Sequence, residues 1–211
     1  YKMNLKYQYW FWPKALTPRF CDDVMAYGNS IKKQKALTGV NRSQPPNEKE
    51  LEHIETKRKS DIVWLNEPWI YNEIHPYVHE ANRQAGWNFQ WDFSENFQFT
   101  EYKKGQFYDW HTDSSEIPFD CPNDPARHGK IRKITIVSML TDPEEYEGGE
   151  LQFNFRATDP QYTEDKVETI TDIGARGSII VFPSFLWHRV KPVTKGLRHS
   201  LVLWNLGQPY V

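Results

Sequence analysis

The stretch that organises this sequence runs from residue 106 to residue 113 and consists of Gln106-Phe107-Tyr108-Asp109-Trp110-His111-Thr112-Asp113. In a β-strand, His111 and Asp113 are two residues apart and project from the same face. A second strand, expected at residues 187–193, would bring His188 alongside them. Two imidazoles and one carboxylate around a point form the facial triad that binds non-haem Fe(II) and leaves its other coordination positions open. The sequence therefore predicts an iron site shared between two strands.

An arginine follows ten residues after His188, inside an otherwise apolar run. Arg198 stands between Leu197 and Leu201, where a buried cation without a counter-charge would cost several kcal/mol. Its planar guanidinium is suited to binding a carboxylate through two parallel hydrogen bonds. The sequence therefore predicts an acidic co-substrate close to the iron.

Length and composition restrict the class of protein. The chain has 211 residues, enough for one substantial core, and 15% aromatic residues favour strands and aromatic-lined clefts. A net charge of −2 provides no basic field for a nucleic-acid partner. Two cysteines, Cys21 and Cys121, cannot build a disulfide framework. With no signal peptide and no apolar run long enough to span a bilayer, we expect a cytoplasmic protein.

The first part of the chain is expected to mix helices and strands. Thr17 followed by a proline is typical of a helix start, and apolar residues recur with helical spacing over residues 66–85. Strands are expected at residues 7–12 and 60–65. The polar composition of residues 37–59 predicts a long surface loop.

The second part is expected to be nearly all strands. Short strands separated by Gly, Pro and Asp turns indicate a sandwich or barrel, and about eight strands are typical of a jelly roll. The expected strands lie at residues 87–102 (one or two strands), 106–113, 131–140, 151–155, 167–170, 178–182, 187–193 and 197–206, with a loop at 114–130 and an acidic turn at 142–149. We expect one domain over residues 1–211, mainly β, with a double-stranded β-helix core at 87–206 and a supporting segment at 1–86.

Three motifs together are similar to those of a known enzyme family. In chain order they are Tyr102-x-x-Gly105-x-Phe107-x-x-x-His111-x-Asp113, Leu140-Thr141-Asp142-Pro143 leading to Gly148-Gly149-Glu150-Leu151, and Phe182-Pro183 followed by His188-x-Val190-x-Pro192-Val193-Thr194-x-Gly196-x-Arg198. Over residues 90–206 the chain resembles the Fe(II)/2-oxoglutarate-dependent dioxygenases, and within them the prolyl 4-hydroxylase-like, PKHD-type hydroxylases. Many prolyl hydroxylases have lysine where this chain has Arg198, which favours the PKHD-type branch and weakens the transfer of a particular proline substrate.

The resemblance implies roles for individual residues. The residues that it makes iron ligands are His111, Asp113 and His188. It pairs Arg198 with the C5 carboxylate of the co-substrate 2-oxoglutarate, with hydrogen bonds from Tyr102 and Ser200. Ascorbate is a further candidate cofactor. Three more residues, Tyr108, Arg132 and Trp204, align with positions that line the substrate cleft, although they are equally expected as core aromatics and a solvated strand charge.

The implied reaction converts O2 and 2-oxoglutarate to succinate and CO2 while hydroxylating a C–H bond, with a prolyl residue in a peptide or protein as the leading substrate. The alternatives are hydroxylation of a free amino acid or other small molecule, and a non-catalytic jelly-roll binding module. Nucleic acid and membranes are not expected as partners. The loops at 37–59 and 114–130 are the candidates to close over substrate. The remaining histidines, His53, His75, His79, His128 and His199, are expected on solvated faces.

Overall fold

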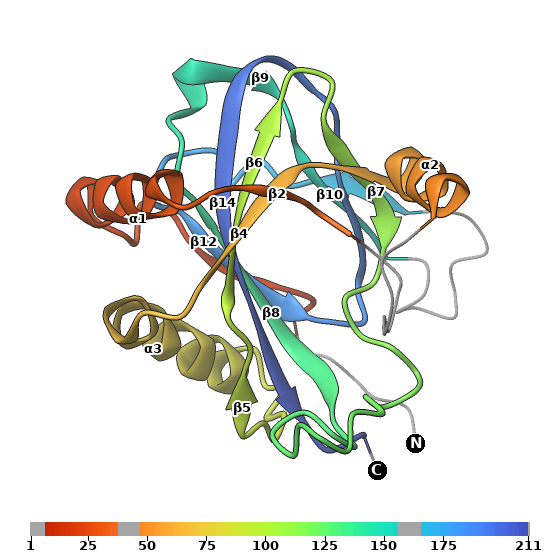
Figure 1. Ribbon diagram of the computed structural model, residues 1–211. Helices are drawn as coiled ribbons and strands as arrows, with labels where there is room; N and C mark the ends of the chain where they lie inside the picture. Colours follow the sequence, from red (N-terminus) through yellow and green to blue (C-terminus); the bar gives the residue numbers. More distant parts are fainter. Residues whose placement is uncertain (1–6, 38–46, 156–165, 211) are drawn as a thin grey trace.

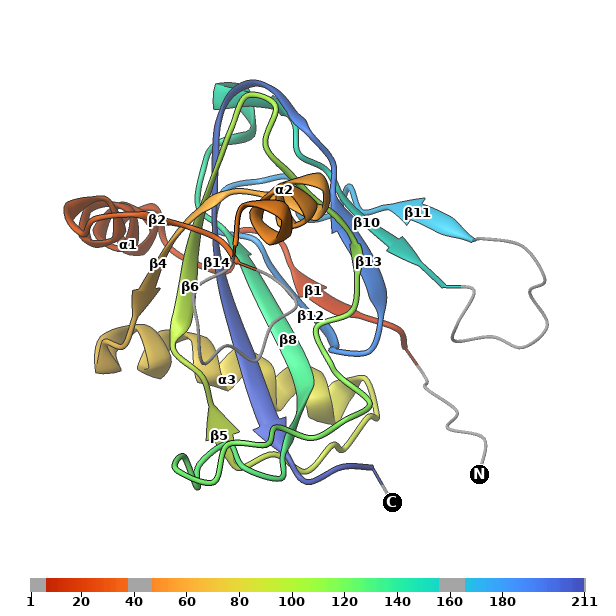
Figure 2. The same ribbon diagram turned by 45° about the vertical axis from the view of Figure 1, so that its right-hand side comes forward.

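The computed structural model describes residues 7–37, 47–155 and 166–210, and it contains two facing sheets with helices outside them (Figures 1 and 2). The larger sheet has nine strands: β1 (Trp10–Trp12), β2 (Gln34–Lys35), β4 (Asp61–Leu65), β5 (Phe93–Ser94), β6 (Phe97–Lys103), β8 (Ile131–Met139), β9 (Tyr146–Gly148), β12 (Ile179–Pro183) and β14 (Val193–Gly207). Its main path runs β1-β12-β8-β14-β6-β4-β2, and β5 and β9 pair with β14.

The smaller sheet has five strands: β3 (Arg58–Lys59), β7 (Phe107–His111), β10 (Leu151–Asn154), β11 (Val167–Thr169) and β13 (Trp187–Val190). Their order is β11-β10-β13-β7-β3, and all the described pairings in both sheets are antiparallel. The expectation of a mainly β chain with a two-sheet core is confirmed.

Within the described ranges, three α-helices accompany the sheets: α1 (Pro18–Ser30), α2 (Glu48–Lys57) and α3 (Pro68–Gln84). α1 begins as expected, because Thr17 accepts a hydrogen bond from the backbone N–H of Phe20 at 3.2 Å. α1 and α3 lie on the outer face of the larger sheet, and α2 lies beside β7 at the edge of the smaller one (Figures 1 and 2). No helix among the described residues is long and apolar enough to cross a membrane.

Strand alternation divides the core in two. On β8, Ile134 and Ile136 belong to the cluster under α1 and α3, while Val137 and Met139 belong to the cluster between the sheets. On β14, Leu201 and Leu203 face the helices and Val202 faces the other sheet. Successive side chains of a strand point to opposite faces, so each strand contributes to both layers. The face between the sheets is the one that carries the candidate site.

The structure corrects the long loop expected at residues 37–59. Residues 38–46 lie outside the described ranges, but the rest of the segment holds α2 and β3. The signal that was overlooked is a capping box: Asn47 accepts from the N–H of Glu50, and the Glu50 side chain accepts from the N–H of Asn47.

Other boundaries also differ from expectation. The strand expected at residues 87–102 begins only at Phe93 and is divided into β5 and β6, and the acidic turn at 142–149 contains a 3₁₀ turn, Pro143–Glu145, as well as β9. Residues 114–130 form no helix or strand, as expected. In this loop, Arg127 forms an ion pair with Glu95 at 3.2 Å.

Candidate active site

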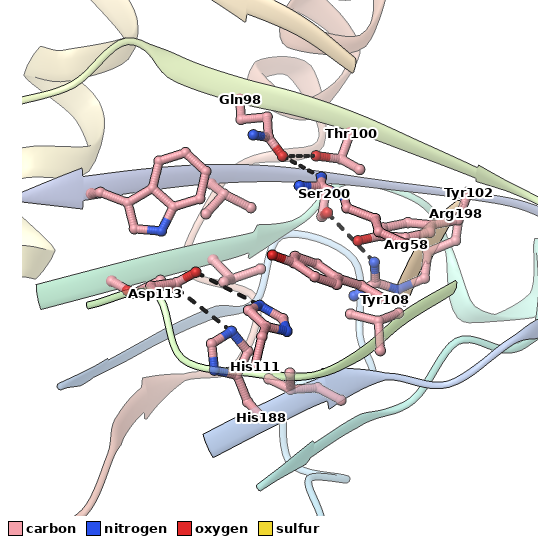
Figure 3. A pocket seen from close by; sticks show the side chains of 16 residues that line it. Arg58, Gln98, Thr100, Tyr102, Tyr108, His111, Asp113, His188, Arg198 and Ser200 are labelled. Atoms are coloured by element: carbon pink, nitrogen blue, oxygen red, sulfur yellow. Dashed lines mark hydrogen bonds and ion pairs between the residues drawn. The ribbon is translucent and has the colours of Figure 1, made fainter. Parts of the chain in front are cut away.

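The two histidines of the predicted triad face each other across neighbouring strands. In the pairing of β13 with β7, His188 is opposite His111. Asp113 follows the end of β7. Its Oδ1 lies 3.7 Å from Nε2 of His111, and its Oδ2 lies 3.5 Å from Nε2 of His188. The three residues each offer one ligand atom, all within 4.8 Å of one another (Figure 3). Two separated segments therefore bring together three side chains that could hold one metal ion.

Hydrogen bonds orient both imidazoles toward a metal. Nδ1 of His111 is 2.7 Å from the carbonyl oxygen of Asp109, and Nδ1 of His188 is 2.8 Å from the carbonyl oxygen of Leu186. A carbonyl oxygen only accepts, so Nδ1 must carry the proton in each ring and donate it. Nε2 is then left with a free lone pair, which is the state of a metal ligand.

Asp113 is held from outside the strand. The expectation that it would lie within the strand is wrong, because β7 ends at His111. Instead, the backbone N–H groups of Asp113 and Ser114 both donate to the carbonyl of Ser184 at 2.9 Å. Thr135 on β8 donates its hydroxyl to Oδ2 of Asp113 at 2.8 Å and lies 2.9 Å from the Ser184 hydroxyl. The carboxylate is thus positioned by the larger sheet and by the turn after β12.

The electrostatics of the triad favour metal binding. Burial and the neighbouring His188 lower the pKa of His111 well below its usual value, so that the ring is neutral. Burial would raise the pKa of Asp113, but His188 and His111, with smaller effects from Arg132 and Trp204, hold that pKa below its usual value. A neutral imidazole and an ionised carboxylate are the protonation states that a metal ion needs.

Arg198 occupies the other end of the same cavity. Its side chain is 2% exposed. It donates to the hydroxyl of Ser200 at 3.4 Å and contacts the sulfur of Met139 at 3.3 Å, and its Cζ lies 5.4 Å from the ring centroid of Tyr102. Its buried Nε has no acceptor, and no described residue forms an ion pair with it. The pairing of Arg198 with an acidic co-substrate stays a prediction.

The cavity that contains both groups encloses about 440 Å³, a volume that includes the open space at its mouth. Alternation along two paired strands directs its polar lining inward. The inward-facing residues of β6 are Gln98, Thr100 and Tyr102, and those of β14 are Arg198, Ser200, Val202 and Trp204. Tyr102 and Ser200 therefore lie next to Arg198, where the resemblance to dioxygenases placed them.

The three candidate substrate residues have different surroundings. Tyr108 and Trp204 line the cavity, whereas Arg132 does not. Arg132 forms an ion pair with Glu95, and its guanidinium lies 3.9 Å from the ring centroid of Trp204. The expectation of a solvated charge for Arg132 is therefore not met. Tyr108 stacks on His111 and is a neighbour of the metal ligand as well as of the cavity.

Arg58 was not among the residues predicted for the site, but it lines the cavity and is 6% exposed. It was assigned to a polar loop, but it stands on β3, opposite Tyr108. Trp64 was also missed; it is 41% exposed, and its ring centroid lies 6.1 Å from that of Trp204. The alternation of Arg58 with Ser60 was the only local signal for β3, whereas Trp64 falls in the strand that was expected at residues 60–65.

The other histidines lie away from the triad. His53, His79 and His128 are exposed, and His75 is half-buried with its Nε2 3.0 Å from the hydroxyl of Ser94. His199 contradicts the expectation of a solvated face, because it is buried and lies 3.0 Å from Glu101. It follows Arg198 on β14 and so points to the opposite side of the sheet.

The residues present fit both implied groups. Two imidazoles and one carboxylate with converging ligand atoms suit Fe(II). A buried arginine with an unpartnered Nε suits the distal carboxylate of 2-oxoglutarate. For ascorbate the described residues offer no separate set of groups that we can assign.

Comparison with known proteins agrees with this geometry. The family model described as the 2OG-Fe(II) oxygenase superfamily matches residues 97–205. A PKHD-type hydroxylase of Xylella fastidiosa is 31% identical over 107 residues, which are 51% of this chain and 42% of that relative. The chain therefore spans less than half the length of this relative.

Solved structures share the fold. A viral collagen prolyl hydroxylase from Paramecium bursaria Chlorella virus-1, in complex with 2-oxoglutarate, superposes with a TM-score of 0.63 at 20% identity, covering 95% of this chain and 97% of that one. A prolyl hydroxylase from Trichoplax adhaerens, in complex with a hypoxia inducible factor peptide, has a TM-score of 0.63 at 19% identity, covering 94% and 83%.

Proposed function

The chain belongs to the 2OG-Fe(II) oxygenase superfamily, and on this basis we propose that it is an Fe(II)- and 2-oxoglutarate-dependent hydroxylase acting on a prolyl residue in a peptide or protein. The observation that carries the proposal is the presence of the triad and of an unpaired buried arginine in one cavity. A binding module would have no use for both.

The residues divide into two binding ends. His111, Asp113 and His188 would hold Fe(II), which supplies the oxidation of a C–H bond by O2 when bound. Arg198 would hold the distal carboxylate of 2-oxoglutarate by a charge-assisted pair, with Ser200 beside it. Because the pair lies in a buried site with low dielectric, it would fix the orientation of the co-substrate relative to the metal.

The apolar lining of the cavity serves the same chemistry. Val137, Leu151, Val190 and Val202 line it together with the polar groups. Their side chains limit the water that reaches the reacting carbon, which protects the oxidising centre from side reactions.

A peptide substrate is supported by the aromatic groups at the cavity. Trp204 lies in its wall and the half-exposed Trp64 lies beside Trp204. Flat aromatic faces suit proline rings in an extended chain. One structure with the same fold was solved with a peptide bound. The arrangement is also open to a free amino acid, which is the second candidate substrate.

The proposal is tested by product analysis. Iron-loaded protein is incubated with 2-oxoglutarate, O2 and libraries of prolyl peptides and free amino acids, and succinate and products heavier by one oxygen atom are measured by mass spectrometry. We expect succinate in every mixture and an oxidised prolyl peptide in some. His188→Ala is the control and should form neither product. Succinate no higher than in this control would contradict the dioxygenase assignment.

A further inference from the structure

The candidate cavity contains a second buried guanidinium that the co-substrate does not account for. Arg58 donates from Nε to the hydroxyl of Ser60 at 2.8 Å and from Nη2 to the side-chain oxygen of Gln98. Both acceptors are neutral, and no described residue forms an ion pair with Arg58. A buried charge that keeps only neutral partners is poorly compensated.

An aromatic ring supplies part of the compensation. Cζ of Arg58 lies 4.4 Å from the ring centroid of Tyr108, whose other face covers His111. A cation–π contact attracts a guanidinium but leaves its in-plane N–H donors free. Of these donors, the N–H groups that Ser60 and Gln98 do not use are the ones that match a carboxylate. Arg58 therefore has the geometry of an anion-binding group placed one ring away from a metal ligand.

The charges of 2-oxoglutarate are already matched elsewhere. One carboxylate has Arg198 as its partner, and the other lies at the metal end in the arrangement proposed above. On β6, Gln98 contacts Arg58 and Tyr102 adjoins Arg198. These two positions are four residue steps apart, which corresponds to about 13 Å of strand. Arg58 is thus left for a different anion.

The position of Arg58 connects the cavity to an outer groove. Arg58 lines the iron cavity, and it also lines an open groove of about 620 Å³ between α2 and strands β2 and β4. Leu51 and Ile54 of α2 contribute to this groove. An anion that reaches Arg58 from this side would belong to a molecule entering from outside, not to the co-substrate bound at the far end.

We propose that Arg58 binds a carboxylate of the primary substrate, so that the enzyme prefers substrates carrying a carboxylate near the carbon that is hydroxylated. The inference rests on the proposed function and narrows its substrate class. Two sources offer this chemistry: the α-carboxylate of a free amino acid, and an acidic side chain or C-terminus of a peptide.

The test compares acids with their neutral counterparts. The probes are N-acetylproline and its amide, free amino acids and their amides, and prolyl peptides with Glu or Gln beside the proline. Substrate-stimulated succinate formation and one-oxygen products are measured for the wild type, Arg58→Gln and Arg58→Lys. The Kd for 2-oxoglutarate is measured anaerobically on the same metal-loaded proteins.

Arg189→Gln is the matched control. Arg189 also donates from Nε to an amide oxygen, that of Gln152 at 2.7 Å, and its Cζ lies 4.6 Å from the ring centroid of Trp110. It does not line the iron cavity. It therefore reproduces the neutral and aromatic partners of Arg58 outside the cavity.

We expect the wild type to use the acid of at least one pair with a KM roughly tenfold or more below that of the neutral partner. Arg58→Gln should remove this preference, Arg58→Lys should retain part of it, and Arg189→Gln should retain all of it. The Kd for 2-oxoglutarate should change less than about twofold in Arg58→Gln.

Equal responses to both members of every pair, including no response, would overturn the inference. So would a tenfold rise in the Kd for 2-oxoglutarate in Arg58→Gln, because Arg58 would then belong to the co-substrate site. A preference for acids among non-prolyl probes alone would uphold Arg58 as the anion-binding group while contradicting prolyl specificity, so the two failures are distinguishable. Activity with free amino acids but not with peptides would identify the α-carboxylate of a free amino acid as the group that Arg58 binds. Activity with peptides but not with free amino acids would identify an acidic side chain or C-terminus of a peptide.

Discussion

The ring of Tyr108 lies flat against the imidazole of His111, with ring centroids 3.4 Å apart and planes inclined by 9°. The Nδ1–H of His111 is held by the carbonyl of Asp109 at the same time. The imidazole of His111 is thus held in its ring plane by the hydrogen bond and perpendicular to that plane by the stacked ring. Tyr108 was expected from sequence as part of the substrate wall, and the structure places it against the metal site as well.

The stack predicts that Tyr108 supports iron binding. Tyr108→Ala should weaken Fe(II) affinity by roughly tenfold, because outer groups that orient metal-binding histidines contribute effects of this size. Tyr108→Phe keeps the ring and should stay close to the wild type. Metal competition titrations measure both variants. Equal affinities in all three proteins would show that the stack does not support the ligand.

The hydroxyl of Thr135 should matter for the same reason. Thr135→Val keeps the shape of the side chain but removes the hydrogen bond to Asp113, and we expect roughly tenfold to a hundredfold weaker Fe(II) binding. Ser138→Ala is the control, since Ser138 is buried on the same strand but does not line the cavity. The iron content of both variants is measured after dialysis against a chelator, and Thr135→Val should retain less iron than Ser138→Ala. Identical retention would remove Thr135 from the site.

Loss of the guanidinium at Arg198 should weaken the binding of 2-oxoglutarate and leave the binding of iron unchanged. Arg198→Met keeps the length of the side chain and removes charge and donors, which corresponds to about 2–5 kcal/mol, or roughly thirtyfold or more in 2-oxoglutarate affinity. Iron stoichiometry should remain that of the wild type. An unchanged succinate yield at limiting 2-oxoglutarate would refute the assignment.

Gly149 is expected to position Arg198. A Cβ at Gly149 would lie 2.8 Å from Cδ of Arg198, so Gly149→Ala should displace the arginine and raise the Kd for 2-oxoglutarate. Gly105→Ala is the matched control, because Gly105 also has a positive φ but nothing lies within 4 Å of its added Cβ. In an Arg198→Ala background the contact with Cδ disappears while a contact with Cγ2 of Val193 at 3.0 Å remains, so the stability cost of Gly149→Ala, measured by urea unfolding, should fall part of the way toward that of Gly105→Ala. An unchanged cost would show that the strain has another origin.

The metal-free protein should lose stability as the pH falls from 7 toward 5. Burial and His188 lower the pKa of His111 well below 6.5, and burial lowers that of His199 below 6.5. The unfolded chain therefore binds protons near pH 6.5 that the folded protein does not, and this uptake favours unfolding below that pH. Urea unfolding at pH 7.5 and 5.5 measures the loss. His199→Gln should make the loss smaller, and a loss of the same size in this variant would contradict the role of His199.

Local patterns predicted much of the fold. Alternation and turn residues indicated most strands after residue 130, and the cap at Thr17 marked the start of α1. These signals are local because pleat and capping depend on neighbours in the chain. The helix at 48–57 was missed although its capping box was present, since polar composition was taken as evidence for a loop.

Residue types and their spacing were also enough to name the candidates for the metal site. His111, Asp113, His188 and Arg198 were identified by residue type, spacing and an apolar setting in which a cation needs a partner. The groups that surround these four residues become visible only in the folded chain. Thr135 reaches Asp113, Tyr108 covers His111 and Arg58 enters the cavity because strands far apart in sequence are paired in one register. Register is set by long-range packing of two sheets, and a local pattern does not carry it.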